Sequence, residues 1–144
     1  MRSTRILVVD DEPAIRALVA KIVERAGFAV DSARDGAEAI SKLDEQTYGV
    51  IVLDLMMPNI DGYGLIEFIK KRGGQHPAII VVSAGDSASL RRLDGSMVHS
   101  IVRKPFDIDV LGDLIAAAAR TMEESHEQQY EPGILQFRKN ESVC

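Results

Sequence analysis

With 144 residues, of which 46% are hydrophobic and 27% are charged, the chain is long enough for one globular domain with a sizeable core. Its net charge of −5 and its short basic clusters argue against direct binding of nucleic acid. The single cysteine, Cys144, excludes an intrachain disulfide, and the first apolar run, Ile6–Val9, is too short for a signal peptide or for membrane insertion, so we expect a cytoplasmic protein.

Apolar runs alternate with amphipathic segments along the chain. In chain order, we predict strands at residues 5–10, 28–33, 49–54, 78–83 and 98–102, and helices at 13–26, from 35, at 63–72 and from 108 to about 120. Such alternation is typical of a parallel sheet with helical crossovers. The strands at 5–10, 49–54 and 78–83 are the most apolar, and we therefore place them at the centre of the sheet.

Two segments carry weaker patterns. Residues 86–95 have few large apolar side chains and favour one short helix at best. Residues 122–144 are polar and contain the break Pro132–Gly133, so we expect a mobile C-terminal tail after a domain that covers residues 4–121.

Acidic residues stand where the central strands end. Asp54 closes the most apolar run, while Asp10 and Asp11 close the first strand and are followed by Glu12. A strand-end aspartate often only caps the next turn, and Asp11 or Glu12 in front of Pro13 has the position of a helix N-cap. Capping explains one of these acids and leaves the others. Open α/β sheets bind ligands at the carboxyl ends of their strands, which makes these acids candidate site residues.

A family resemblance rests on residues at four strand ends: Asp10–Asp11, Asp54 with Met57–Pro58 and Asp61–Gly62, Ser83–Ala84, and Lys104–Pro105–Phe106. In this order, and with nearly the spacing of that family, they resemble a receiver domain of the two-component response regulators. The resemblance covers roughly residues 4–121. It implies a flavodoxin-like (βα)5 fold, a doubly wound parallel five-stranded sheet with strand order 2-1-3-4-5.

The resemblance also implies the chemistry of the acids. Asp54 would be the phosphoacceptor, and Mg²⁺, with Mn²⁺ also possible, would bind to Asp11, Asp54 and the backbone carbonyl of Met56. Asp10 would contact the metal through water. Carboxylate and carbonyl oxygens with water in the remaining positions are the ligands that Mg²⁺ prefers.

Three further residues would hold the transferred phosphoryl group. Lys104 would supply an ammonium, Ser83 a hydroxyl and Ala84 an amide N–H, so that charge on the phosphoryl oxygens is neutralised. The resemblance assigns the conformational switch to Ser83 and to the position of Ile101, where the family usually has an aromatic residue. Ile101 is apolar and stiff at χ1, so we expect it to stay packed in both states.

Two positions would tune hydrolysis of the phosphorylated form. Met56 lies two residues beyond Asp54 and has no polar group to orient water, while Gly85 lies two residues beyond Ser83 and has no side chain to block it. The spacing from Ser83 to Lys104 is one residue shorter than the family norm, which predicts a short or irregular helix between them.

The resemblance implies a bacterial, single-domain response regulator without an output domain. It would accept phosphate from a histidine kinase or a histidine phosphotransfer protein and contact a downstream protein target, as a monomer or weak dimer. It would not be an enzyme, although it would assist its own phosphorylation and dephosphorylation. The main alternative is a pseudo-receiver that signals without phosphorylation. A haloacid-dehalogenase-like phosphatase would need a second acid where this chain has Met56, and a flavodoxin-like cofactor binder would need a phosphate loop where it has acids.

Overall fold

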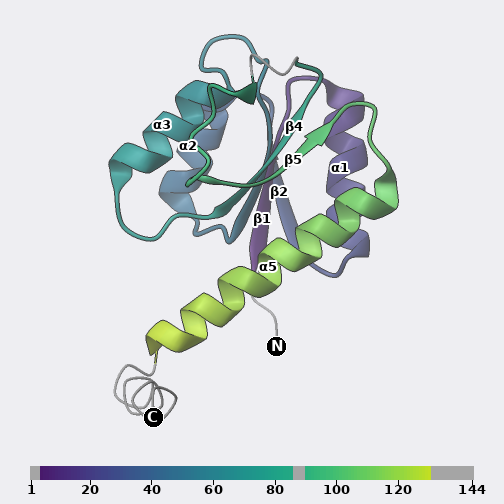
Figure 1. Cartoon of the computed structure of the whole chain (residues 1–144). Helices are drawn as coiled ribbons and strands as arrows, with labels where there is room; N and C mark the ends of the chain where they lie inside the picture. The colour runs from purple at the N-terminus through teal and green to yellow at the C-terminus, as the bar shows by residue number, and fades with distance from the viewer. Residues whose placement is uncertain (1–3, 86–89, 131–144) are drawn as a thin grey trace.

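The computed structural model of the chain describes residues 4–85 and 90–130, with residues 125–130 described by their backbone alone. A five-stranded parallel sheet has the strand order β2-β1-β3-β4-β5 (Figure 1), which confirms the predicted flavodoxin-like architecture. The strands are β1 (Arg5–Val9), β2 (Ala29–Ala33), β3 (Val50–Asp54), β4 (Ala78–Ser83) and β5 (Val98–Arg103).

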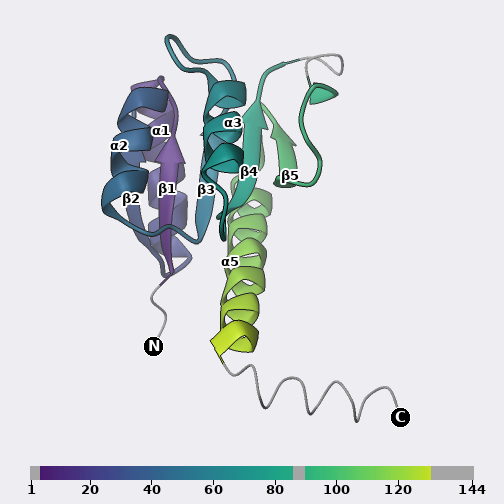
Figure 2. The ribbon, with the colours of Figure 1, turned by 90° about the vertical axis from the view of Figure 1, so that its left-hand side faces the viewer.

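Helices cover both faces of this sheet and divide the core into two halves (Figures 1 and 2). The helices are α1 (Pro13–Arg25), α2 (Gly36–Glu45), α3 (Gly62–Arg72) and α5 (Ile108–Tyr130). Buried side chains of α2 and α3 pack with one set of strand residues, and those of α1 and α5 pack with the alternate set. Every residue of β3 is buried, as expected for a central strand covered on both faces.

Helices α2 and α3 each begin with an aspartate whose side chain caps the helix. The Asp35 side chain accepts a hydrogen bond from the Glu38 N–H, and the Asp61 side chain accepts one from the Gly64 N–H. At α1, by contrast, Glu12 occupies the N-cap position but its side chain makes no capping hydrogen bond. Glu12 is therefore free to serve another purpose.

Helix α5 is longer than the sequence predicts. It continues to Tyr130 instead of ending near Arg120, and in both ribbon views its C-terminal part extends beyond the sheet (Figures 1 and 2). The apolar stripe ends near residue 120, but good helix formers continue until the Pro132–Gly133 break. The predicted end of this helix near residue 120 is therefore wrong, since α5 continues to Tyr130; the mobility of a tail from residue 122 stays a prediction, and residues 131–144 lie outside the described part of the chain.

The segment between β4 and β5 is irregular where it is described. Leu90 is helical and residues 91–97 have no regular secondary structure, with the Leu93 N–H bonded to the Leu90 carbonyl and the Met97 N–H to the Asp94 carbonyl. An ion pair of 2.8 Å between Lys70 Nζ and Asp94 Oδ2 ties this segment to α3. The short helix predicted for residues 86–95 falls partly on residues 86–89, which are outside the described residues.

Candidate functional site

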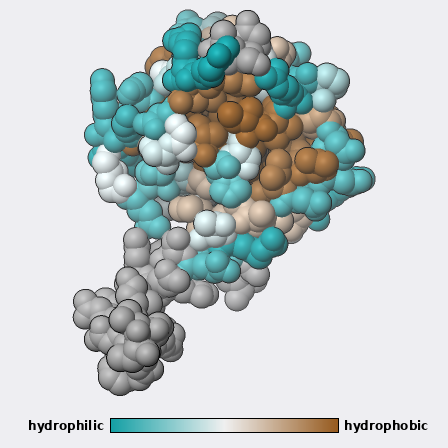
Figure 3. Space-filling model, viewed as in Figure 1, coloured by the Kyte–Doolittle hydropathy of each residue, from teal (hydrophilic) through white to brown (hydrophobic). Residues whose placement is uncertain are grey.

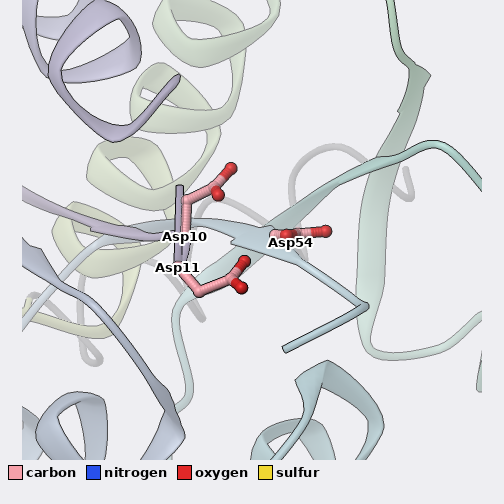
Figure 4. A group of neighbouring side chains, drawn as sticks. All are labelled: Asp10, Asp11 and Asp54. Atoms are coloured by element: carbon pink, nitrogen blue, oxygen red, sulfur yellow. The ribbon is translucent and has the colours of Figure 1, made fainter. Parts of the chain in front are cut away.

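The acids at the carboxyl ends of β1 and β3 form one cluster. Val9 pairs with Leu53 across the sheet, so the residues that follow them, Asp10 and Asp54, lie side by side. Carboxylate oxygens of Asp10, Asp11 and Asp54 lie within 4.8 Å of one another. Figure 4 shows Asp10 and Asp11 adjacent at the end of β1 and Asp54 extending from β3. The cluster predicted from the strand ends is thus present.

Burial makes the charged form of two of these acids costly. Asp10 is 3% exposed and Asp54 is 5% exposed. Burial raises the pKa of Asp54 to about 6, and the negative charge of Asp10 raises it further. The Met56 N–H donates a hydrogen bond of 3.2 Å to Asp54 Oδ1, which lowers the pKa in part. Burial also raises the pKa of Asp10, against the hydrogen bond of 2.9 Å that it accepts from the Glu12 N–H. A nearby positive charge would therefore stabilise the ionised form of both carboxylates.

Lys104 supplies positive charge to this cluster. Its Nζ lies 3.4 Å from Asp10 Oδ2, 3.4 Å from Glu12 Oε1 and 3.8 Å from Asp54 Oδ2. Partial burial lowers the pKa of Lys104, but the charges of Asp54 and Asp10 and the contact with Glu12 outweigh it, so that the net pKa is raised. The ammonium is therefore held in its charged form beside Asp54, as the prediction requires.

Ser83 closes the side of the site formed by β4. Its side chain is buried, and its hydroxyl oxygen accepts a hydrogen bond of 2.9 Å from the Gly85 N–H. Because that oxygen acts here as an acceptor, its proton remains to be donated. Val82 pairs with Asp54 in the sheet, so Ser83 lies one residue further along the neighbouring strand. Ala84 follows it and is exposed.

Of the predicted tuning and switch positions, Met56 and Ile101 lie at the surface, whereas Ser83 is buried. Met56 is 61% exposed, and Gly85 is held by the bond from its N–H to Ser83. Ile101 is 45% exposed, so the expectation that it is packed is wrong for this structure. Along the edge strand β5 the side chains alternate, which puts Ile101 on the same exposed face as His99 and Arg103.

Apolar side chains gather on the face that carries β5 and α5 (Figure 3). Large apolar residues that remain exposed include Ile101 on β5 and Ile108 and Val110 at the start of α5. Ile101 is thus a surface residue of β5 and not part of the core.

Sequence reasoning missed Glu12 and Arg16 as parts of the site. Glu12 contacts Lys104, and Arg16 Nη1 donates a hydrogen bond of 3.0 Å to the backbone carbonyl of Asp10. Glu12 stood out only as a possible cap of α1, because its actual partner is 92 positions away in the chain. The helical period of α1 was the one signal for Arg16, since it places residue 16 one turn after Glu12.

The cluster suits a hard divalent cation. The three carboxylates offer oxygen ligands on one edge of the sheet, and burial raises the pKa values of two of them, so a bound cation would favour their charged form. Asp11 and Asp54 are the residues that would hold Mg²⁺ directly, with Asp10 behind them. The contribution of the Met56 carbonyl stays a prediction.

Comparisons with known proteins agree with this geometry. Residues 6–116 match the family model described as the response regulator receiver domain. The transcriptional regulatory protein TcrA of Mycobacterium tuberculosis is 33% identical over 117 residues, which are 81% of this chain and 46% of TcrA. The chain thus spans less than half the length of this relative.

Two solved structures illustrate the likeness. A Francisella response regulator receiver domain has a TM-score of 0.74 and 30% identity, over 83% of this chain and 98% of that one. Response regulator TrrA from Thermotoga maritima, solved in complex with Mg²⁺-BeF, has a TM-score of 0.71 and 33% identity, over 80% and 98% of the two chains.

Among residues 4–85 and 90–130, no helix combines the length and the apolar character that a membrane crossing requires.

Proposed function

The chain belongs to the response regulator receiver domain family, and from this premise we propose that Asp54 accepts a phosphoryl group and that the resulting charge switches protein contacts. The observation that carries the proposal is the position of the Lys104 ammonium, which lies 3.8 Å from Asp54 Oδ2 and is shared with Asp10. A buried carboxylate beside a cation and a buried hydroxyl matches the needs of a phosphoryl acceptor.

Each step of the transfer has a residue in place. One carboxylate oxygen of Asp54 forms the new bond to phosphorus, while the bond from phosphorus to the donor atom breaks and its electron pair leaves with the donor. The Lys104 ammonium exchanges a carboxylate oxygen for a phosphoryl oxygen, and the Ser83 hydroxyl donates a hydrogen bond to a second phosphoryl oxygen. The Ala84 N–H is the third donor. Bound Mg²⁺ would neutralise a further oxygen as a Lewis acid.

The partners and setting form part of the same proposal. The phosphoryl group would come from a histidine kinase or a histidine phosphotransfer protein, in the cytoplasm of a bacterium, and a downstream protein would read the phosphorylated state. The protein would act as a phosphoacceptor that assists its own turnover, and would not convert a separate substrate. Met56 and Gly85 would set how easily water reaches the phosphoryl group, since the Met56 N–H bonds to Asp54 and the Gly85 N–H bonds to the neighbouring Ser83 hydroxyl.

Intact mass measurement tests the acceptor directly. We expect the protein, incubated with Mg²⁺ and a small acyl phosphate, to gain the mass of one phosphoryl group, and Asp54→Asn to gain none. Asp44→Asn is the matched control, because Asp44 has an exposed side chain on α2, and it should gain as much as the parent protein. Gain of phosphate by Asp54→Asn would refute the assignment.

A pseudo-receiver remains the competing function. It predicts no mass gain in any variant, together with a partner that binds the unmodified protein. The buried Ser83 hydroxyl and the Lys104 ammonium at the same strand ends favour the phosphoacceptor, because both can donate to phosphoryl oxygens on Asp54, whereas buried aspartates alone would account only for the cation.

A further inference from the structure

Glu12 makes a contact that neither the fold nor the proposed phosphorylation requires. It stands at the N-cap position of α1, where a polar side chain ordinarily accepts a hydrogen bond from its own helix, yet it makes no such bond. Instead, its Oε1 lies 3.4 Å from Lys104 Nζ. The Glu12 side chain therefore contacts Lys104, far away in the sequence, and not the N-terminus of its own helix.

This contact occupies a donor that phosphorylation needs. The ammonium of Lys104 has three protons to donate, and it faces carboxylate oxygens of Asp10, Glu12 and Asp54. Lys104 Nζ has hydrogen bonds to Asp10 and Glu12 and lies 3.8 Å from Asp54, so a phosphoryl oxygen on Asp54 competes with these two partners for the position of the ammonium. The identity of the partner that gives way determines how readily the site accepts the group.

The exposure of the three partners decides which one gives way. The side chains of Asp10 and Asp54 are 5% exposed, so either would be left buried without its cation. The Glu12 side chain is 61% exposed, and water can solvate its carboxylate as soon as Lys104 leaves. Glu12 is thus the partner that is released at the lowest cost.

We propose that Glu12 is a positioning residue that holds Lys104 in the unphosphorylated state and competes with the phosphoryl group for its ammonium. This inference rests on the proposed function of Asp54. It predicts that Glu12→Gln binds a phosphoryl mimic more tightly. An ion pair with one well-exposed partner is weak, so the half-saturating concentration should fall by about threefold rather than by orders of magnitude.

Glu12→Asp separates competition for Lys104 from simple charge repulsion. Aspartate keeps the negative charge, but its shorter side chain falls short of Lys104 and is well suited to cap α1. If Glu12 acts through Lys104, then Glu12→Asp should bind the mimic more tightly, as Glu12→Gln does, and should also raise the melting temperature. If Glu12 acts only by repelling an anion, Glu12→Asp should behave like the parent protein.

The experiment titrates the whole chain with beryllofluoride in Mg²⁺ buffer and follows binding by amide NMR signals, with the Lys104 ammonium signal as a second readout. Glu24→Gln is the control, because it removes the same charge from an exposed position twelve residues further along α1. We expect tighter binding and a shifted Lys104 signal in Glu12→Gln and Glu12→Asp, and neither change in Glu24→Gln.

Parent-like affinity in Glu12→Gln, or in Glu12→Asp alone, overturns the inference while leaving Asp54 as acceptor. Absence of both mimic binding and mass gain in the parent protein overturns the proposed function and this inference with it.

Discussion

In the metal-free protein, replacing Asp54 with asparagine is expected to stabilise the fold at neutral pH. The carboxyl of Asp54 is buried, and its pKa is raised from 3.8 to about 6. Asparagine has nearly the same shape, keeps an oxygen for the Met56 N–H, and leaves Lys104 in contact with Asp10 and Glu12. A shift of about 2 pH units corresponds to roughly 3 kcal/mol of stability lost to the charged carboxylate.

The effect has a defined pH window. Because the pKa of Asp54 is raised in the folded protein, the penalty is absent below the unfolded pKa, grows from about pH 4 to about pH 6, and is constant above that. For a chain of this size, roughly 3 kcal/mol corresponds to about 6–10 °C in melting temperature. The melting temperatures of Asp54→Asn and of the parent protein, measured in EDTA, should therefore differ at about pH 7.5 and converge near pH 4.

Asp44→Asn is the control for removing a carboxylate without relieving burial. Its side chain is 66% exposed and lies 4.0 Å from Arg72 Nη1, so its melting temperature should change by no more than about 2 °C at either pH. Equal melting temperatures for Asp54→Asn and the parent at neutral pH would refute the reasoning. So would a difference that persists unchanged down to pH 4, because it could not arise from ionisation.

Three further predictions concern other parts of the molecule. Mg²⁺ should raise the melting temperature of the parent by binding the native state, and Asp11→Asn should weaken this response; an unchanged response would remove Asp11 from the metal site. Gly85→Glu should change the decay rate of the phosphorylated form in a mass-based time course, because Gly85 lies beside Ser83, and equal decay would remove position 85 from hydrolysis. Tyr48→Phe should cost about 1–2 kcal/mol in urea unfolding, because the buried Tyr48 hydroxyl donates a hydrogen bond of 2.6 Å to Asp31; no loss would show that this bond contributes nothing.

Strong local patterns explain why most of the fold was predictable. The run Val50–Leu53 and its equivalents in β1 and β4 are continuous apolar segments, which identify central parallel strands without any partner being known. The acids at their ends then fall at one edge of the sheet, because parallel strands share a direction. The strand order itself came from the family resemblance, since burial alone separates centre from edge but does not order the strands.

Three features that the sequence did not predict each depend on information that the local pattern lacks. Ile101 is apolar, but its exposure depends on which face of an edge strand it occupies, and that is set by the alternation of β5 rather than by its own hydrophobicity. Helix α5 continues past Arg120 with no apolar stripe to mark its end; its helix formers favour this, and the Thr4 hydroxyl donates a hydrogen bond of 2.7 Å to Glu123. The contact of Glu12 with Lys104 joins residues that are 92 positions apart in the sequence, and only the assembled sheet brings them together.

The hydrogen bonds at the ends of β4 and β5 indicate which site residue transmits a change. The Lys104 N–H donates to the Ser83 carbonyl at 2.9 Å, and Arg103 Nη1 donates to the Gly85 carbonyl at 3.3 Å. The Lys104 side chain is long and can exchange partners while its backbone stays bonded to Ser83. The Ser83 hydroxyl has no such freedom, because its oxygen is bonded to the Gly85 N–H. Movement of this hydroxyl toward Asp54 must either break that bond or carry Gly85 with it, and both disturb the backbone where the segment after β4 begins. We therefore expect Ser83 to pass the state of Asp54 to the surface formed by β5 and α5, while Lys104 responds only within the site.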